Sequence, residues 1–124
     1  MKIGRLDHVN VRTSRVDEMV LWYETYLGFK KGWRPAFGFD GAWLYAGDHP
    51  MVHLVHVDTE CRSVEPKIEH FAFTATGYSG FLEKLQSDGI EADIVHVPGL
   101  PIVQVNVKDC DGNHVHIDFP ADEL

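Results

Sequence analysis

Four of the eight histidines in this chain stand at positions whose spacing could build a metal site. His8 and His53 lie 45 residues apart in the first half, and His70 and His116 lie 46 residues apart in the second half. Corresponding histidines of the two halves are offset by 62 and 63 residues. Neutral imidazole is a good ligand for Zn, Fe, Ni, Mn and Cu. Four imidazoles at repeat-equivalent positions therefore predict a transition-metal site.

The stretch that carries His116 predicts a tight turn followed by a strand. Residues 111–113 read Asp-Gly-Asn, and these residue types tolerate the positive φ of a tight turn. In residues 114–119 apolar side chains alternate with His114, His116 and Asp118, so one face of the strand packs and the other presents imidazoles and a carboxylate. The other histidines, His49, His56, His96 and His114, are interpreted as structural or solvent-facing, and a supporting role stays open for His114 beside His116.

Hydrophobic periodicity predicts the elements that must position these histidines. A period of two predicts strands over residues 5–12, 29–34, 42–46, 51–57, 67–74, 91–97, 102–107 and 114–119. Helical spacing predicts a helix that starts after the N-cap Ser14 and ends before Gly28, and a second helix over 78–88. The order is thus strand, helix and three strands, repeated once.

The two halves also correspond in sequence, which predicts an internal repeat. Leu6-Asp7-His8-Val9 corresponds to Ile68-Glu69-His70-Phe71, and Val52-His53-Leu54 corresponds to Val115-His116-Ile117. We therefore expect an α+β fold of tandem βαβββ modules that form a curved, barrel-like mixed sheet with the helices outside. The expected organisation is a single domain, 1–124, with module one at 5–57, a linker at 58–66 and module two at 67–119.

In such a module the helix covers one face of the sheet and the opposite face lines a concave cup. The first and last strands must run side by side to bring His8 near His53 and His70 near His116. Strand parity places further polar and aromatic side chains in the cup. We expect Tyr45 and Gln104 to orient the substrate or donate to a developing oxyanion, and we assign substrate binding to Arg12, Asn10, Trp43 and Asn106.

The net charge of −8 argues against nucleic acid and anionic membranes as partners, and it permits a cationic ligand. No apolar run is long enough to span a membrane, and the first residues do not lead into a signal-peptide core. Two cysteines form no disulfide framework. These features predict a cytoplasmic protein.

In their order and spacing these motifs resemble the vicinal oxygen chelate superfamily, which includes glyoxalase I, bleomycin-resistance proteins and extradiol dioxygenases. The resemblance covers residues 5–119 and is most specific at residues 6–9, 22–29, 68–71 and 108–113. It implies one divalent transition metal, with Fe, Mn, Ni, Co and Zn as the candidates, held by His8, His53, His70 and His116. It also implies a small-molecule substrate and a homodimer.

Two departures from the family pattern bear on the reaction. Where the family usually has a glutamate as its last ligand this chain has His116, and where glyoxalase I usually has glutamate or glutamine it has His53. A four-histidine set has no metal-bound carboxylate to act as a base, which argues against glyoxalase I activity. We expect a lyase, isomerase or dioxygenase that chelates vicinal substrate oxygens and stabilises an enolate-like intermediate. The alternative is a bleomycin-resistance-like protein that sequesters a small molecule without turnover.

Overall fold

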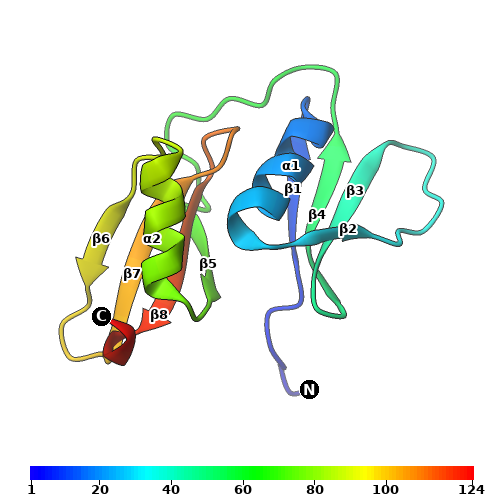
Figure 1. Cartoon of the computed structure of the whole chain (residues 1–124). Coiled ribbons are helices and arrows are strands. Elements are labelled where there is room, and N and C mark those ends of the chain that lie inside the picture. The colour runs from blue at the N-terminus through cyan, green and yellow to red at the C-terminus, as the bar shows by residue number, and fades with distance from the viewer. The chain divides into compact units, whose positions relative to one another are not determined.

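The computed structural model describes residues 1–124 and divides into two compact units, Met1–Arg62 and Ser63–Leu124. The boundary falls inside the predicted linker, residues 58–66. Each unit has the element order βαβββ (Figure 1). This confirms the predicted α+β class and the tandem modules.

Unit 1 contains one helix and four strands, and its second strand is the shortest. The elements are β1 (Val9–Thr13), α1 (Val16–Leu27), β2 (Lys30–Gly32), β3 (Gly41–Ala46) and β4 (His49–His56). Strand β1 starts later than the sequence predicts, so His8 lies just before it. Pairing along β1 begins opposite Val52 of β4, which leaves the preceding residues outside the sheet.

Unit 2 repeats this pattern and ends in a short 3₁₀-helix. The elements are β5 (His70–Thr74), α2 (Tyr78–Ser87), β6 (Asp93–His96), β7 (Ile102–Lys108), β8 (His114–Pro120) and η1 (Ala121–Glu123). Strand β5 begins at His70 and β8 begins at His114. Neither helix of the chain is both long and apolar enough to cross a membrane.

The two sheets have the same topology, with strand orders β1-β4-β3-β2 and β5-β8-β7-β6. The first and last strands of each unit pair in parallel, and the other neighbours pair antiparallel. Each sheet is therefore mixed. The prediction that the first and last strands run side by side is confirmed in both units.

The core of unit 1 lies between α1 and one face of its sheet. The side chains buried there come from helix positions three and four residues apart and from alternate strand positions, namely Met19, Val20, Trp22, Tyr23, Ala42, Leu44, Val52 and Leu54. Helical and strand periodicity thus place the apolar side chains on facing surfaces.

Unit 2 builds its core in the same way, with α2 against its sheet. The buried side chains are Leu85, Val103, Val105, Val107, Val115, Ile117 and Phe119. Tyr78 and Phe81 of α2 place their rings 5.6 and 5.7 Å from that of Phe119. These contacts leave the opposite face of β7 and β8 to polar side chains.

The helix ends show what the local sequence controls. Gly28 closes α1 in the left-handed conformation, with φ of 69°, as predicted. The prediction that Ser14 is the N-cap is wrong, because Arg15 occupies that position and no side chain caps the helix there. Instead, the hydroxyl oxygen of Thr13 accepts a hydrogen bond from the backbone N–H of Arg15.

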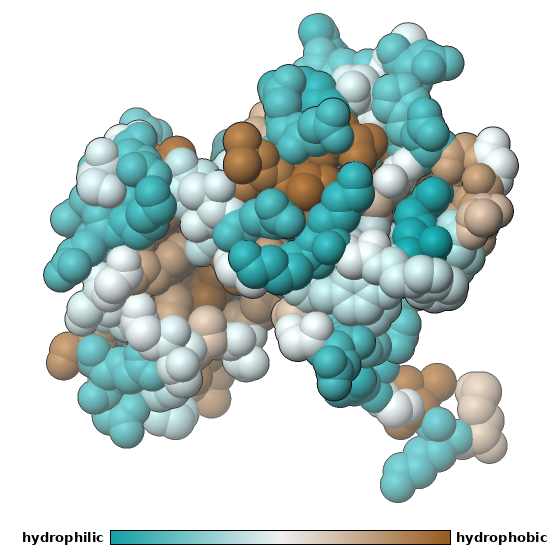
Figure 2. All heavy atoms as spheres, turned by 45° about the vertical axis from the view of Figure 1, so that its right-hand side comes forward, coloured by the Kyte–Doolittle hydropathy of each residue, from teal (hydrophilic) through white to brown (hydrophobic).

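The start of α2 is capped by a residue far along the chain. One carboxylate oxygen of Glu123 accepts the backbone N–H groups of Gly77 and Tyr78 at 2.7 and 2.9 Å. At the other end of the chain, the N-terminal segment extends from unit 1 (Figure 2). The apolar side chains of Met1, Ile3 and Leu6 in this segment are exposed.

Candidate metal centre

The four repeat-equivalent histidines form two pairs, one in each unit. The rings of His8 and His53 have centroids 3.9 Å apart, and those of His70 and His116 are 4.3 Å apart. Each pair joins the start of the first strand to the middle of the last strand. The parallel pairing of β1 with β4 and of β5 with β8 is what brings the members of each pair together.

In unit 1 the two imidazoles are stacked. The planes of His8 and His53 differ by 10°, and Trp43 of β3 also stacks on His53 at 4.0 Å. His53 is only 7% exposed and lies between the two other rings. Because the nitrogen lone pairs of stacked rings lie in parallel planes, one ring must turn before both can bind one metal. His8 precedes the strand and is half-exposed, so it is the ring with room to turn.

In unit 2 the two imidazoles are inclined to each other. The planes of His70 and His116 differ by 57°, which lets ring nitrogens point toward a common position. His116 is 6% exposed, whereas His70 is exposed at the end of β5. The pair therefore combines one fixed ring with one ring open to solvent.

An acidic residue precedes the first histidine of each pair and binds its ring. A carboxylate oxygen of Asp7 lies 2.7 Å from Nδ1 of His8. Glu69 makes the equivalent contact with Nδ1 of His70. Since a carboxylate accepts, Nδ1 must carry the proton in both rings, and Nε2 of the neutral ring keeps the lone pair.

The second histidine of each pair is also held through one nitrogen. Nδ1 of His116 donates to Oδ1 of Asp118 at 2.9 Å. Nε2 of His53 donates to the carbonyl oxygen of Pro50 at 3.0 Å. The remaining nitrogens, Nε2 of His116 and Nδ1 of His53, therefore carry lone pairs.

This pattern fits the chemistry of a divalent transition metal. Histidine ligands bind metals through one nitrogen and donate the other N–H to a carboxylate or carbonyl, which fixes the tautomer. All four histidines have this second contact. Every fully buried polar side-chain atom has a hydrogen-bond partner. Nδ1 of His53 and Nε2 of His116 have none, so these two nitrogens are in contact with solvent although their residues are mostly buried.

Electrostatics favours the neutral form of His53 and the ionised form of the two carboxylates. Burial lowers the pKa of His53, and the nearby His8 lowers the pKa further, so the neutral ring is favoured. Hydrogen bonds from His8 lower the pKa of Asp7, and those from His70 and His114 lower the pKa of Glu69. Both carboxylates therefore stay ionised and can hold the ring protons.

The predicted substrate residues of unit 1 lie along the strands that carry His53. Asn10 is the register partner of His53 and is exposed. Arg12 follows two residues later on the same face of β1 and is exposed as well. Trp43 is the antiparallel partner of His53 and stacks on it. The structure thus brings Asn10 and Trp43 to His53 and places Arg12 farther along.

The hydroxyl of Tyr45 already has an acceptor. It donates to the carbonyl oxygen of Trp33 at 2.5 Å, and its ring packs over Gly32, where an added Cβ would lie 2.6 Å from ring carbons. These contacts tie β3 to the chain that follows β2. The hydroxyl can serve a substrate only if the bond to Trp33 is broken.

The predicted substrate residues of unit 2 lie on β7, which pairs with the strand that carries His116, β8. Gln104 is the register partner of Asp118, and its side chain makes no hydrogen bond. Asn106 is the partner of His116, but its amide bonds to His114 and to the carbonyl oxygen of Asp93. Gln104 is therefore free to orient a ligand, whereas Asn106 is engaged.

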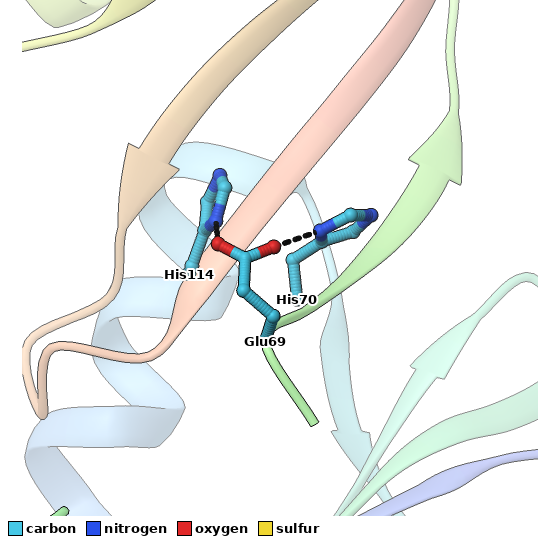
Figure 3. Close-up of side chains that lie close together, drawn as sticks. All are labelled: Glu69, His70 and His114. Carbon is cyan, nitrogen blue, oxygen red and sulfur yellow. Dashed lines mark hydrogen bonds and ion pairs between the residues drawn. The ribbon is translucent and has the colours of Figure 1, made fainter. Parts of the chain in front are cut away.

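The sequence reasoning missed the part played by the acidic residues. Glu69 contacts both His70 and His114, and Asp7 contacts His8 and His49 (Figure 3 shows the first group). A signal was present, because an acidic residue precedes the first histidine of both halves. The interpretation of His114 as structural or supporting left out its proximity to His70.

A cleft of about 520 Å³ lies elsewhere in unit 1. Its walls come from the start of α1 and from β2, β3 and the end of β4, and they mix acidic and basic side chains that include Arg15, Asp17, Glu18, Lys31, Arg34, Asp40 and His56. None of the predicted metal or substrate residues lines it. The two histidine pairs are thus distinct from this cleft.

Comparisons with known proteins agree with this architecture. Residues 5–117 match the model of the Glyoxalase/Bleomycin resistance protein/Dioxygenase superfamily. The chain is 30% identical to Glyoxylase I 4 of Arabidopsis thaliana over 94% of this chain and 71% of that protein.

Solved structures show the same fold. A glyoxalase family protein from Bacillus anthracis superposes with a TM-score of 0.78 at 21% identity, covering 97% of this chain and 98% of that one. An antibiotic binding protein, TnmS3 from Streptomyces sp. CB03234, gives 0.70 at 19% identity over 97% and 98%. The repeated βαβββ units, the paired histidines and the match along residues 5–117 together place the chain in the Glyoxalase/Bleomycin resistance protein/Dioxygenase superfamily.

Proposed function

We propose that this chain is a divalent-metal-dependent enzyme of the glyoxalase/dioxygenase type, with His8, His53, His70 and His116 as the metal ligands. The observation that carries the proposal is that each of these rings donates one N–H to an oxygen and keeps the other nitrogen unpaired. Fe, Mn, Ni, Co and Zn all accept imidazole nitrogen, so the donor set leaves the choice among them open.

A metal bound there supplies a Lewis acid and a template for two neighbouring oxygens of a substrate. Around it, the unpaired amide of Gln104 would donate to a substrate oxygen. Arg12, exposed on the face that carries Asn10, would bind a carboxylate or phosphate group of the substrate in a bidentate manner. These residues orient a small molecule that carries oxygen functions.

The chain's own carboxylates hold protons on the rings. Asp118 holds Nδ1 of His116, and the lowered pKa of Asp7 and of Glu69 suits the same task better than taking a proton from a substrate. The hydroxyl of Tyr45 hydrogen-bonds to Trp33, and the amide of Asn106 hydrogen-bonds to His114. These two residues would therefore position their neighbours and would not donate to the substrate. We expect a lyase, isomerase or dioxygenase that acts as a homodimer.

A second candidate function is supported by the aromatic side chains next to His53. Trp33 and Phe37 each lie 6.2 Å from Trp43, and Phe37 stacks on Phe39 at 5.2 Å. Trp33, Phe37 and Phe39 are exposed. A flat ligand could stack there without turnover, and the structurally similar TnmS3 is an antibiotic binding protein. Sequestration of a small molecule is therefore the alternative.

The His70→Ala variant separates the two functions, with His56→Ala as a matched control outside the proposed ligands. Metal content, ligand binding and turnover of catechols and of thiol adducts of 2-oxoaldehydes are measured on all three proteins. The enzyme proposal expects that metal and turnover are lost in His70→Ala and kept in the control. Ligand binding that survives loss of the metal, with no turnover in the wild type, would favour sequestration.

A further inference from the structure

A second group of metal-binding side chains lies within unit 2. His70 and His114 are the first residues of β5 and β8, and they are direct register partners in the parallel pair. Glu69 precedes β5 and places its carboxylate between the two rings (Figure 3). One ligand atom from each of the three residues lies within 4.8 Å of the others.

Two contacts define how the carboxylate is shared. One oxygen of Glu69 meets Nδ1 of His70, and the other lies 2.7 Å from Nδ1 of His114. Both rings thus turn the same nitrogen toward one carboxylate.

Contacts outside this group fix the proton on the far side of His114. The amide of Asn106 lies 3.2 Å from the carbonyl oxygen of Asp93, which only accepts, so the NH₂ end must point there. The amide oxygen then faces Nε2 of His114 at 2.9 Å. Nε2 must therefore donate, and it carries the ring proton.

This leaves Nδ1 of His114 facing Glu69 with no proton if the ring is neutral. A lone pair and a carboxylate oxygen 2.7 Å apart repel each other, so a positive charge must lie between them. Two species can supply it: a second proton, which makes the ring an imidazolium, or a metal ion. The position between Nδ1 of His114 and the carboxylate of Glu69 therefore suits a cation.

We propose that Glu69, His70 and His114 form a divalent transition-metal site of their own, separate from the four-histidine set. Two imidazoles and one carboxylate suit Fe, Mn, Co or Zn. Binding displaces the Nδ1 proton of His114, which leaves to solvent, and the ring proton of His70 moves from Nδ1 to Nε2. The donors all belong to unit 2.

The corresponding region of unit 1 differs, because Met51 stands at the position that corresponds to His114. There Asp7 is flanked by His8 and His49, and Nε2 of His49 donates to the backbone oxygen of Asp7 at 2.6 Å. Nδ1 of His49 accepts from the guanidinium of Arg5 at 3.3 Å. In unit 1 an arginine therefore supplies the positive charge. Lys67 stands at the corresponding position of unit 2 and makes no contact with the group.

The two donor sets share His70 and compete for it. A neutral imidazole has one lone pair, so His70 binds through Nδ1 in the new site or through Nε2 in the four-histidine set. A chain therefore fills one of the two sites at a time. The new site needs neither His53 nor His116.

Titration with Co²⁺ alone tests the proposal on the full chain. The His53→Gln/His116→Gln double variant removes two ligands of the four-histidine set. We expect it to bind one Co²⁺ per chain, and we expect Glu69→Gln or His114→Gln in that background to weaken binding by more than about 100-fold, since loss of an outer partner alone costs about 10- to 100-fold. His49→Gln in the same background is the matched control and should leave the affinity unchanged. Absence of Co²⁺ binding by the folded double variant would overturn the proposal.

A second measurement keeps the buried His116. Ring ¹⁵N NMR follows each histidine of the His8→Gln/His53→Gln variant while Zn²⁺ is added, because this variant lacks the unit 1 ligands of the four-histidine set. We expect the Nδ1 signal of His114 to move to a metal-bound position. If only His70 and His116 respond, the second site does not exist while the four-histidine proposal stands, so the two failures are distinguishable.

Discussion

The turn that leads into β8 should be the most sensitive polar position in unit 2. Asp109 is 5% exposed, and its Oδ1 accepts the backbone N–H groups of Asp111 and Asn113 at 3.0 and 2.9 Å. The side-chain amide of Asn113 donates to the same carboxylate. Asp109→Ala removes the acceptor of all three donors at once, just before the strand that carries His114 and His116.

The loss can be estimated from these contacts. A buried donor left without an acceptor costs about 1–3 kcal/mol. Water can reach part of the turn, so we expect Asp109→Ala to lower the free energy of unfolding by about 2–4 kcal/mol in total. With an m value of about 2 kcal/mol/M, the urea midpoint falls by about 1–2 M.

The assay is urea denaturation followed by far-ultraviolet circular dichroism. Fluorescence is unsuitable, because all three tryptophans lie in unit 1. Asp109→Asn keeps one acceptor oxygen and should cost less than the alanine variant, and Asp122→Ala is the control at an exposed position. A change below about 0.5 kcal/mol for Asp109→Ala, the size typical of surface substitutions, would refute the argument.

Three further predictions concern helix ends and pH. Glu123→Gln removes the charge that caps the start of α2 and should destabilise the chain by about 1 kcal/mol in the same denaturation assay. Gly28→Ala forces a side chain into φ of 69° and should lower the free energy of unfolding by about 1 kcal/mol. Gly38→Ala is the control and should be nearly neutral, because nothing lies within 4 Å of an added Cβ there. Equal effects of the two substitutions would contradict the reasoning. Because the pKa of His53 is lowered from 6.5, the unfolded chain binds a proton first, so stability should fall as pH drops below about 6.5. A His53→Gln variant should reduce this dependence of the free energy of unfolding on pH. An unchanged dependence would contradict the role assigned to His53.

The fold was predictable from the sequence because its signals are local and repeated. Alternating apolar residues fix which face of each strand packs, and Gly28 marks the end of α1 by its freedom to adopt positive φ. The start of α1 was less predictable, because Thr13 rather than Ser14 supplies the side-chain oxygen nearby. Several residue types suit that position, so sequence alone does not select one.

The histidine pairs were predictable and their surroundings were not. The repeat implies that His70 and His116 belong together, and parity places them on one face. The residue that stands opposite His70 depends on the strand register. A period-two pattern does not determine this register, because a shift of two residues keeps the same side chains on the same face. Register makes His114 the partner of His70 and brings Glu69 to both, so the carboxylate became visible only in the structure.

The most direct test of the metal-site proposal is the metal content of protein purified without a chelator or a histidine tag. Wild type and His70→Ala are compared, with His96→Ala, which lies outside both proposed ligand sets, as the control. The account predicts about one Fe, Mn, Ni, Co or Zn per chain in the wild type and in the control. We predict a clear fall in His70→Ala, because His70 belongs to both proposed ligand sets. No metal in the wild type, and none taken up on titration, would contradict the account.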